Sequence, residues 1–311
     1  MGKQIVSILS NKKTKSTVEK IASIIFICCA TVSVLAVLSI TIYMFISGTP
    51  ALFKVGITEI LFSNVWNPTS SNPEFGILYI ILTSIIGVFL AICIGVPIGV
   101  FTAINLSEIA NPKVRSVVKS AVELLAGIPS VVYGLLGILI ICPLMYQLEL
   151  FIFKDSPTHQ FTGGSNMISA ILVLAIMILP TLINMSETAL KTVPDDLRKS
   201  SLALGASQMQ TIFKVVLPTA KNGIISAIVL GVGRAIGEAM AILLVAGNSV
   251  NLPTPFNSVR FLTTGIVSEM GYASGLHREV LFTIGLVLFI FIIVINLILT
   301  FVLKGGNQDG K

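Results

Sequence analysis

The C-terminal part of the chain reads Val280-Leu-Phe-Thr-Ile-Gly-Leu-Val-Leu-Phe-Ile-Phe-Ile-Ile-Val-Ile-Asn-Leu-Ile-Leu-Thr-Phe-Val-Leu303, and this segment contains no charged side chain. A helix that crosses the hydrocarbon core of a bilayer needs about 20 mostly apolar residues. The segment meets both the length and the composition that such a helix requires. It is therefore predicted to span a membrane.

The composition of the whole chain supports the same conclusion. Of its 311 residues, 54% are apolar and 11% are charged, and the mean hydropathy is +0.96. A soluble domain carries about 25% charged residues, and a disordered chain is poor in apolar residues, so both classes are excluded. The net charge of +6 would suggest nucleic-acid binding in a soluble protein, but in a membrane protein the placement of the positive residues sets the orientation instead. We expect an all-α integral membrane protein with no nucleic-acid partner.

Six apolar runs are long enough to cross a bilayer, and they predict six transmembrane helices. The runs cover residues 21–46, 75–106, 121–146, 166–185, 223–247 and 280–303. The first run is longer than the apolar core of a signal peptide, which has about 7–15 residues, so we interpret it as a retained anchor. Lysine and arginine gather in the head, in the segments after the second and fourth runs and in the tail, which predicts that both termini are cytoplasmic.

These spans divide the chain into consecutive parts. The parts are a basic cytoplasmic head (1–20), a first transmembrane anchor (21–47), an external loop (48–74), a five-helix core (75–303) that includes a cytoplasmic loop (188–222), and a cytoplasmic tail (304–311).

Prolines interrupt three of the runs, at Pro97, Pro129 and Pro180. A proline leaves a backbone carbonyl one turn earlier without its N–H donor, and in lipid this carbonyl needs a partner from a neighbouring helix or from water. Glycine and proline are also common in ordinary membrane helices, where they only shape the packing. The three prolines together favour helix breaks or hinges in a bundle that moves or is lined by water.

Two ionisable residues lie halfway along the fifth run, in the segment Gly231-Val-Gly-Arg-Ala-Ile-Gly-Glu-Ala-Met-Ala241. Arg234 and Glu238 are four residues apart, so on a continuous helix they would share a face and could form an ion pair. A charged residue at this depth costs at least about 2.5–3.5 kcal/mol and therefore faces the protein interior or a water-filled path. Two interpretations remain open: an ion pair that joins helices, or an anion pathway in which the planar donors of Arg234 bind phosphate or sulfate.

The polar segment between the fourth and fifth runs, residues 188–222, is longer than a simple connection requires. Pro194, followed by Asp195 and Asp196, predicts a helix start because proline and acidic residues favour the first turn. Gly205 interrupts the apolar pattern, which predicts a helix, a turn and a second helix. The apolar side chains either cover the end of the bundle or insert into a groove of a partner protein, and the pattern favours neither.

The same segment is similar to a known motif. Lys199-Ser-Ser-Leu-Ala-Leu-Gly205, followed after nine residues by Val215-Val-Leu-Pro218, resembles the EAA loop of ABC importer permeases. The glycine, leucine and proline fall in register, whereas Lys-Ser-Ser stands where the family usually has Glu-Ala-Ala. Because this chain lacks the family's glutamate, a salt bridge from that residue is in doubt. The resemblance still implies that the loop docks on a partner.

Other segments narrow the resemblance. Glu123-Leu-Leu-Ala-Gly-Ile-Pro-Ser-Val-Val-Tyr-Gly134 and Gly231-Val-Gly-Arg-Ala-Ile-Gly-Glu238 resemble the signatures of phosphate-specific importer permeases. Trp66-Asn-Pro68 followed by Phe75-Gly76, together with the N-terminal anchor, is more similar to the PstC-type than to the PstA-type subunit.

The resemblance implies a type I ABC importer permease fold and a set of partners. The partners would be a second, PstA-type permease, two ATPase subunits that bind ATP and Mg, and an external phosphate-binding protein that delivers phosphate. Arg234 and Glu238 would line the translocation pathway. The coupling helix to the ATPase subunits would comprise Ser200, Ser201, Leu202, Ala203, Leu204, Gly205 and Ala206. The protein would lie among the lipids of a bacterial or archaeal cytoplasmic membrane.

Several alternative classes can be weighed against this one. The chain lacks the G-x-x-x-x-G-K-[ST] phosphate loop, so we expect it neither to hydrolyse ATP nor to bind a cofactor itself. A permease for sulfate or molybdate remains an alternative. A secondary transporter would show internal inverted repeats, and an intramembrane enzyme would need a Ser/His pair or two aspartates at membrane depth. His159 and His277 lie isolated in polar loops, so no metal site is expected.

Overall fold

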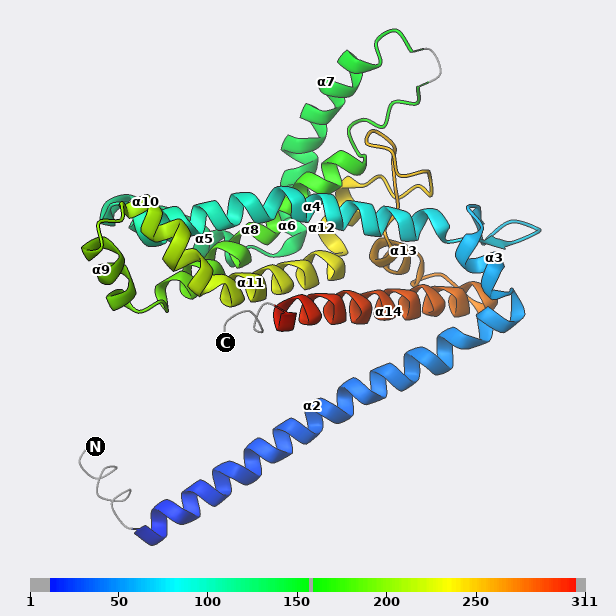
Figure 1. The fold of residues 1–311 in the computed structure, drawn as a ribbon. Coiled ribbons are helices and arrows are strands. Elements are labelled where there is room, and N and C mark those ends of the chain that lie inside the picture. The colour runs from blue at the N-terminus through cyan, green and yellow to red at the C-terminus, as the bar shows by residue number, and fades with distance from the viewer. Residues whose placement is uncertain (1–11, 157–158, 306–311) are drawn as a thin grey trace.

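The computed structural model describes residues 12–156 and 159–305, and this part of the chain is mostly helical (Figure 1). It begins with α2 (Lys12–Lys54), α3 (Ile57–Phe62) and an antiparallel hairpin of β1 (Trp66–Asn67) and β2 (Glu74–Phe75). The elements that follow are α4 (Leu78–Ile104), the π-helical η1 (Asn105–Ile109), α5 (Pro112–Ala126), α6 (Ser130–Leu136), the π-helical η2 (Gly137–Ile141), α7 (Cys142–Ile152), α8 (Met167–Lys191), α9 (Asp195–Ala203), α10 (Gln208–Thr211), the π-helical η3 (Ile212–Val216), α11 (Leu217–Gly237), α12 (Met240–Val245), α13 (Leu262–Glu269) and α14 (Gly275–Gly305).

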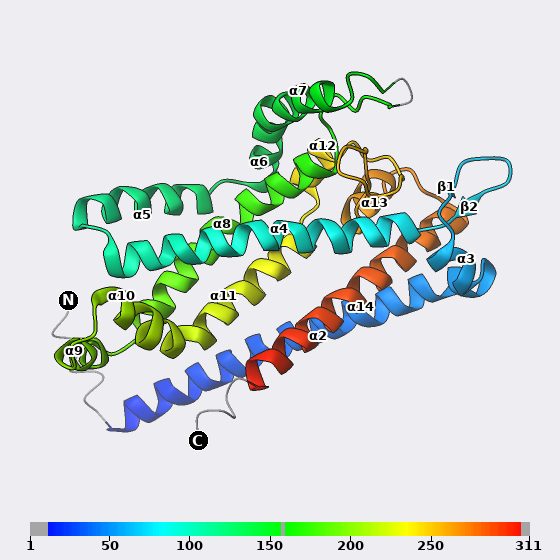
Figure 2. The same cartoon turned by 45° about the horizontal axis from the view of Figure 1, so that its top comes forward.

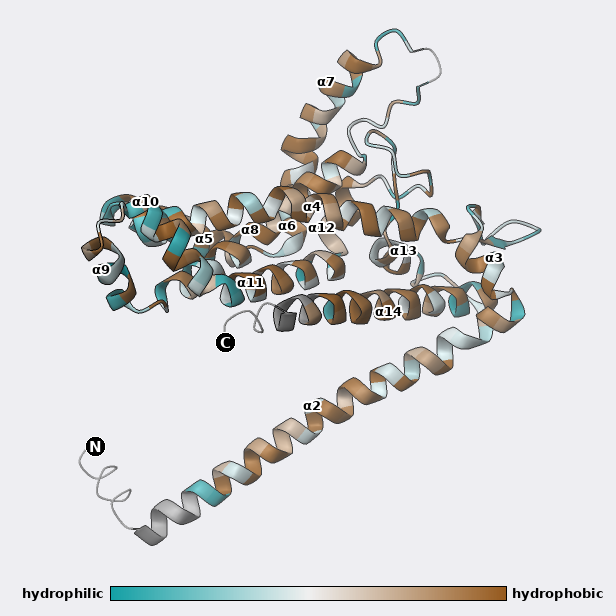
Figure 3. Ribbon diagram, viewed as in Figure 1, coloured by the Kyte–Doolittle hydropathy of each residue, from teal (hydrophilic) through white to brown (hydrophobic). Residues whose placement is uncertain are grey.

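Among the described residues, six helical segments are long and apolar enough to cross a membrane, as the sequence predicted. These segments are Glu19–Lys54, Leu78–Ile109, Ser130–Ile152, Met167–Lys191, Gln208–Gly237 and Gly275–Ile298. Hydrophobic residues extend along most of their length in Figure 3. The fold is therefore the predicted all-α membrane bundle.

Helix α8 is the central helix of the bundle and packs against both α4 and α11. In the most apolar stretch of α8, 67% of the residues are buried, whereas none is buried in the most apolar stretch of α2. The approach of α4 to α8 is close at two glycines, Gly95 and Gly99. A β-carbon on either glycine would lie 2.8 Å from a side-chain atom of α8, belonging to Ile178 and Leu182 respectively. Small residues permit this kind of packing between membrane helices, and it fixes the position of α8.

The helix break predicted at Pro129 is present, whereas the breaks predicted at Pro97 and Pro180 are not. Helices α4 and α8 continue through Pro97 and Pro180 without interruption. Pro129 itself is extended, with φ −60° and ψ 143°, and separates α5 from α6. The apolar run 121–146 therefore does not form one helix: its first residues complete α5, and the third candidate span covers Ser130–Ile152 instead. Figure 2 shows the turn of the chain between α5 and α6.

The first helix, α2, packs mainly against the last one, α14. The contact involves the C-terminal part of α2, where Thr283 Oγ1 donates a hydrogen bond to the carbonyl oxygen of Gly48 at 2.6 Å. An ion pair of 2.7 Å between Lys54 and Glu279 lies at the same end. In Figure 1 the N-terminal part of α2 diverges from the other helices, and the large apolar side chains between Ile21 and Leu38 are exposed. Such a surface is suited to contact with lipid.

The two ends of the bundle are built from different elements. The start of α2 lies at the same end as α9 and α10, whereas α3, the β1–β2 hairpin and α13 lie at the opposite end (Figures 1 and 2). The distribution of lysine and arginine assigns the end with α9 and α10 to the cytoplasm, and this orientation stays a prediction.

Candidate functional site

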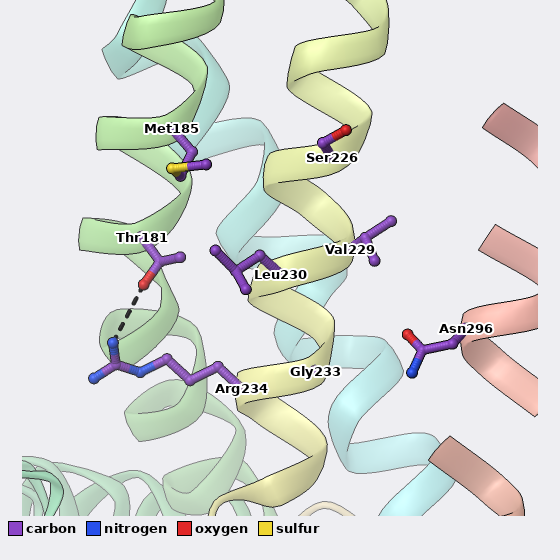
Figure 4. Close-up of a pocket in the computed structure, with 8 residues that line it drawn as sticks. All are labelled: Thr181, Met185, Ser226, Val229, Leu230, Gly233, Arg234 and Asn296. Atoms are coloured by element: carbon purple, nitrogen blue, oxygen red, sulfur yellow. Dashed lines mark hydrogen bonds between the residues drawn. The ribbon is translucent and has the colours of Figure 1, made fainter. Parts of the chain in front are cut away.

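A cavity of about 730 Å³ lies between α8, α11 and α14 (Figure 4). Its lining residues are Thr181, Met185, Ser226, Val229, Leu230, Gly233, Arg234 and Asn296. Three of these side chains are apolar, three are polar and uncharged, and Arg234 is the single charged residue among them. The cavity thus combines an uncharged wall with one positive charge.

The guanidinium of Arg234 extends from α11 toward α8, as Figure 4 shows. Its Nη1 donates a hydrogen bond to Oγ1 of Thr181 at 3.2 Å. No carboxylate of the described residues forms an ion pair with it, and a guanidinium has five N–H donors in a planar arrangement. The site can therefore offer both charge and donors to an anion. Thr181 was not singled out by the sequence, and a hydroxyl directly after Pro180 in an apolar run was the only signal.

Glu238 does not pair with Arg234, contrary to the expectation from their spacing. Helix α11 ends one residue before Glu238, which is extended with a ψ of 130°. Its carbonyl oxygen accepts a hydrogen bond from Thr263 Oγ1 at 2.6 Å, and its Oε1 accepts one from the N–H of Ala241 at 2.8 Å. These contacts hold the chain out of the helix, so the apolar run 223–247 forms two helices. The two charges consequently do not share one helix face.

Two glycines of α11 have different surroundings. A β-carbon on Gly231 would lie 3.1 Å from Leu182, so this glycine permits close packing of α11 on α8. A β-carbon on Gly233 would have no atom within 4 Å, and this residue lines the cavity. Gly231 therefore permits the packing of α11 on α8, and Gly233 leaves space in the cavity beside Arg234.

Tyr133 connects the two sides of the break between α5 and α6. Its hydroxyl donates a hydrogen bond to the carbonyl oxygen of Leu125 at 2.7 Å, and the residue is buried. Leu125 lies in the last turn of α5, where carbonyls lack their regular helical partners. The tyrosine thus ties α6 to the end of α5 across Pro129. The sequence pattern contained this tyrosine but did not indicate the contact of its hydroxyl.

The predicted coupling segment is only partly helical. Helix α9 ends at Ala203, so the residues from Leu204 to Ala206 lie outside the helix, contrary to the expectation of one helix over 200–206. The turn predicted at Gly205 is present, and its φ of +86° is a conformation that side chains with a β-carbon rarely adopt. Ser207 then begins α10 with a capping box.

The apolar residues of this loop divide into two groups. Leu204 is 89% exposed, and Leu197 and Leu202 are exposed as well. In contrast, Ile212 and Val216 in η3 are buried against the bundle. A groove of about 420 Å³ opens beside the exposed group, lined by Leu197, Ser201, Leu204, Ala206, Gln210, Lys214 and Val215. The first half of the loop is therefore free to contact a partner, while the second half covers the bundle.

Each of the two histidines has a carboxylate partner, although their positions in the sequence had suggested that they are isolated. His159 Nε2 lies 2.8 Å from Glu149 Oε1, and His277 Nε2 lies 2.7 Å from Glu269 Oε2. Both glutamates are buried, and Arg260 also pairs with Glu269. Within the described ranges no group of three or more His, Cys, Asp or Glu residues could hold a metal ion. The partners lie on different elements or across a loop, which no local pattern indicates.

The chain is similar in sequence and in structure to known proteins. Residues 95–305 match the family described as binding-protein-dependent transport system inner membrane component. The chain is 37% identical over 298 residues to the probable ABC transporter permease protein YqgH of Bacillus subtilis (strain 168), with 93% of each chain covered. It is 35% identical over 264 residues to the phosphate transport system permease protein PstC of Pasteurella multocida (strain Pm70), with 81% of each covered.

A solved structure shares the fold. The structure of a bacterial ABC transporter involved in the import of the acidic polysaccharide alginate contains a chain that matches with a TM-score of 0.63 at 16% identity. The match covers 95% of this chain and 100% of that chain. At this identity the likeness concerns the arrangement of the helices.

Proposed function

The chain belongs to the family of binding-protein-dependent transport system inner membrane components, and from this membership we propose that it is the permease subunit through which an ATP-driven importer carries inorganic phosphate into the cell. Family membership confirms the resemblance that the motifs indicated. The chain is a multi-pass membrane subunit of an ABC transporter with the type I permease fold, and it is a transport component rather than an enzyme by itself.

The observation that carries the choice of an anion is the position of Arg234. Its side chain enters a cavity at membrane depth, has one hydroxyl partner, and forms no ion pair among the described residues. A permanent charge at this depth is costly, so it normally faces a partner, a water-filled path or a bound ion. A tetrahedral oxyanion can accept several hydrogen bonds from the planar donors of arginine, and its charge offsets the desolvation of the guanidinium.

The conformation of Glu238 supports this proposal. If its carboxylate were bound to Arg234, it would compete with phosphate for the same donors. Instead the carboxylate accepts a hydrogen bond from the backbone of α12, and its carbonyl is held by Thr263. We assign Glu238 to the pathway as the residue that maintains the helix break beside Arg234, and Arg234 as the residue that contacts the anion.

The remaining parts of the importer follow from the family. We expect a second, PstA-type permease to complete the pathway, an external phosphate-binding protein to deliver phosphate, and two ATPase subunits to bind ATP and Mg. The exposed residues of the segment 200–206 would contact the ATPase subunits, which requires the end with α9 to be cytoplasmic. Both termini would then be cytoplasmic, in the membrane of a bacterium or an archaeon. Pro129 is the hinge candidate that separates two helices, and Pro97 and Pro180 would act within continuous ones.

Uptake by the complete complex in proteoliposomes tests the proposed function. We expect accumulation of radiolabelled phosphate that depends on ATP and on the binding protein, and that unlabelled phosphate abolishes. Excess sulfate or molybdate should leave it unchanged. Competition by sulfate or molybdate would identify a permease for another oxyanion, and accumulation without ATP would identify a secondary transporter.

A further inference from the structure

A partly buried ion pair joins the ATPase-facing loop to the membrane helices. Arg198 in α9 and Glu108 in η1 are separated by 90 positions in the sequence. Arg198 Nη2 donates to Glu108 Oε1 at 2.8 Å, and Nε donates to Oε2 at 3.2 Å. Only 19% of the arginine side chain and 10% of the glutamate side chain are exposed. Both carboxylate oxygens are used, so the pair has the bidentate geometry that fixes orientation as well as distance.

The same guanidinium also binds the end of α8 and the short segment that follows it. Nη2 donates to the carbonyl oxygen of Leu190 at 2.9 Å, and Nη1 donates to that of Val193 at 2.6 Å. The last carbonyls of a helix lack their regular partners, so a cation at this position is favourable. Arg198 therefore connects three elements through one rigid group: α9, the end of α8, and the π-helical end of α4.

Helix α9 packs on η3, the segment that leads into α11, but its contacts with α4 and α8 are few. None of its residues is buried. The hydroxyl of Ser201 lies 2.9 Å from that of Thr211, but this contact leads to α10 and not to α4 or α8. From α10, Gln208 Nε2 donates to the carbonyl oxygen of Glu108 at 3.0 Å, which reinforces the same attachment point. Among the described residues, Arg198 makes the side-chain hydrogen bonds that join α9 to η1 and to the end of α8, so these two elements are linked to a displacement of α9 through Arg198 and Glu108.

We propose that Arg198 is the positioning residue that transmits movement of α9 to α4 and α8 during the transport cycle. The proposal rests on the proposed function, which assigns the segment 200–206 to the ATPase contact. Helix α8 carries both the Leu190 carbonyl and Thr181, and Thr181 is the partner of Arg234 in the cavity. A shift of α8 therefore changes the surroundings of the anion site.

Hydrogen exchange on the complete complex tests this transmission without any transported substrate. A non-hydrolysable ATP analogue is added, and amide exchange is followed in α9 and at the cytoplasmic ends of α4 and α8. In the unmodified complex we expect the analogue to change exchange at all three places. In Arg198→Lys, which lacks the planar fork, and in Glu108→Gln, which lacks the charge, the change should remain in α9 and fall at least tenfold in α4 and α8.

The matched control changes another partner of the same guanidinium. Asp195 Oδ1 lies 3.3 Å from Arg198 Nη1, but the aspartate side chain is 82% exposed. Asp195→Asn should therefore leave the exchange pattern unchanged, because exposed ion pairs contribute little. The double variant of Arg198→Lys with Glu108→Gln should be no worse than either single variant, since the two residues act through one contact.

The same variants are compared for phosphate moved per ATP hydrolysed. We expect at least a tenfold lower ratio in Arg198→Lys and Glu108→Gln, with the ATPase subunits still co-purifying. An unchanged exchange pattern at α4 and α8 would overturn the proposal, and so would loss of the ATPase subunits, which would make Arg198 a docking residue only. If the unmodified complex moves no phosphate, the proposed function fails while the exchange result still decides the role of Arg198.

Discussion

Arg234 and Thr181 meet across the space between α11 and α8, with the guanidinium Nη1 3.2 Å from the threonine hydroxyl oxygen (Figure 4). Both residues line the same cavity. The hydroxyl orients the arginine but does not neutralise it, so the charge remains available to an anion that enters the cavity. This relationship leads to the first prediction.

Thr181→Val should lower phosphate uptake at subsaturating phosphate by about tenfold. Valine has nearly the same shape, but it removes a hydrogen bond to a charged group, which is worth about 1.5–3 kcal/mol, and about 1.4 kcal/mol corresponds to a factor of ten. The matched control is Thr188→Val in the same helix, because the Thr188 hydroxyl only donates to the Asn184 carbonyl of its own helix at 2.8 Å. Equal uptake by both variants would contradict the assigned role of Thr181.

Arg234→Gln should abolish phosphate uptake, and Arg234→Lys should impair it strongly because a point charge lacks the planar donors. Combining Arg234→Gln with Glu238→Gln should not restore uptake, since Glu238 is bound elsewhere and no broken ion pair needs relief. Assembly of each complex is checked by size-exclusion chromatography. Near-normal uptake by a well-assembled double variant would mean that the two residues only join helices.

Gly205→Val should leave the protein in the membrane and reduce co-purification of the ATPase subunits. A residue with a β-carbon at the φ of +86° is strained by about 1–2 kcal/mol, and the turn that presents Leu204 would shift. Gly163→Val is the control, because Gly163 also has a positive φ, of +65°, and a β-carbon on it would have no atom within 4 Å. Gly163 lies between α7 and α8, away from this loop, so its variant should keep the ATPase subunits bound.

Glu269→Gln should lower the free energy of unfolding by about 3 kcal/mol, because it removes the charge of a buried carboxylate that pairs with the partly buried Arg260. His277 loses its acceptor in the same variant. Glu279→Gln is the control: its ion pair with Lys54 is solvent-exposed and should contribute about 0–1 kcal/mol. Thermal unfolding of the purified protein in detergent measures both. A similar loss in the two variants would show that the pairs of Glu269 with Arg260 and His277 do not stabilise this end of the bundle.

The orientation can be tested with single cysteines in a background that lacks the four native ones. Ser71→Cys in the exposed tip of the β1–β2 hairpin should react with an impermeant thiol reagent added to whole cells. Leu204→Cys, at the most exposed leucine of the loop 188–222, should react only after the membrane is permeabilised if this loop is cytoplasmic as predicted. Labelling of position 204 in intact cells would reverse the predicted topology.

The sequence was sufficient for the number of spanning helices because the bilayer demands long apolar segments. It was not sufficient for the helix breaks. A proline such as Pro97 or Pro180 can remain in a helix when neighbouring helices support it, whereas Pro129 ends one. In the same way, the spacing of Arg234 and Glu238 predicted a pair only on the assumption of an unbroken helix.

The contacts that sequence reasoning missed join residues distant in the chain. Arg198 and Glu108 are 90 positions apart, and neither has a distinctive local pattern. Each histidine pairs with a glutamate whose burial depends on the surrounding bundle. Charge and spacing alone do not indicate which polar residues the fold brings together, although the Gly205 turn and the acidic start of α9 were local enough to predict.

The packing of α2 against α14 also bears on how the protein is made. The Gly48–Thr283 hydrogen bond joins positions 235 residues apart, so the first of the described helices to leave the ribosome has its main helix partner in the last of them. Until α14 is made, α2 lacks its main helix partner within the chain, whereas the helices α4, α8 and α11 that pack together are already present. Attachment of α2 is thus a closing step of biogenesis, and a chain truncated before α14 would retain the central bundle but leave its anchor undocked.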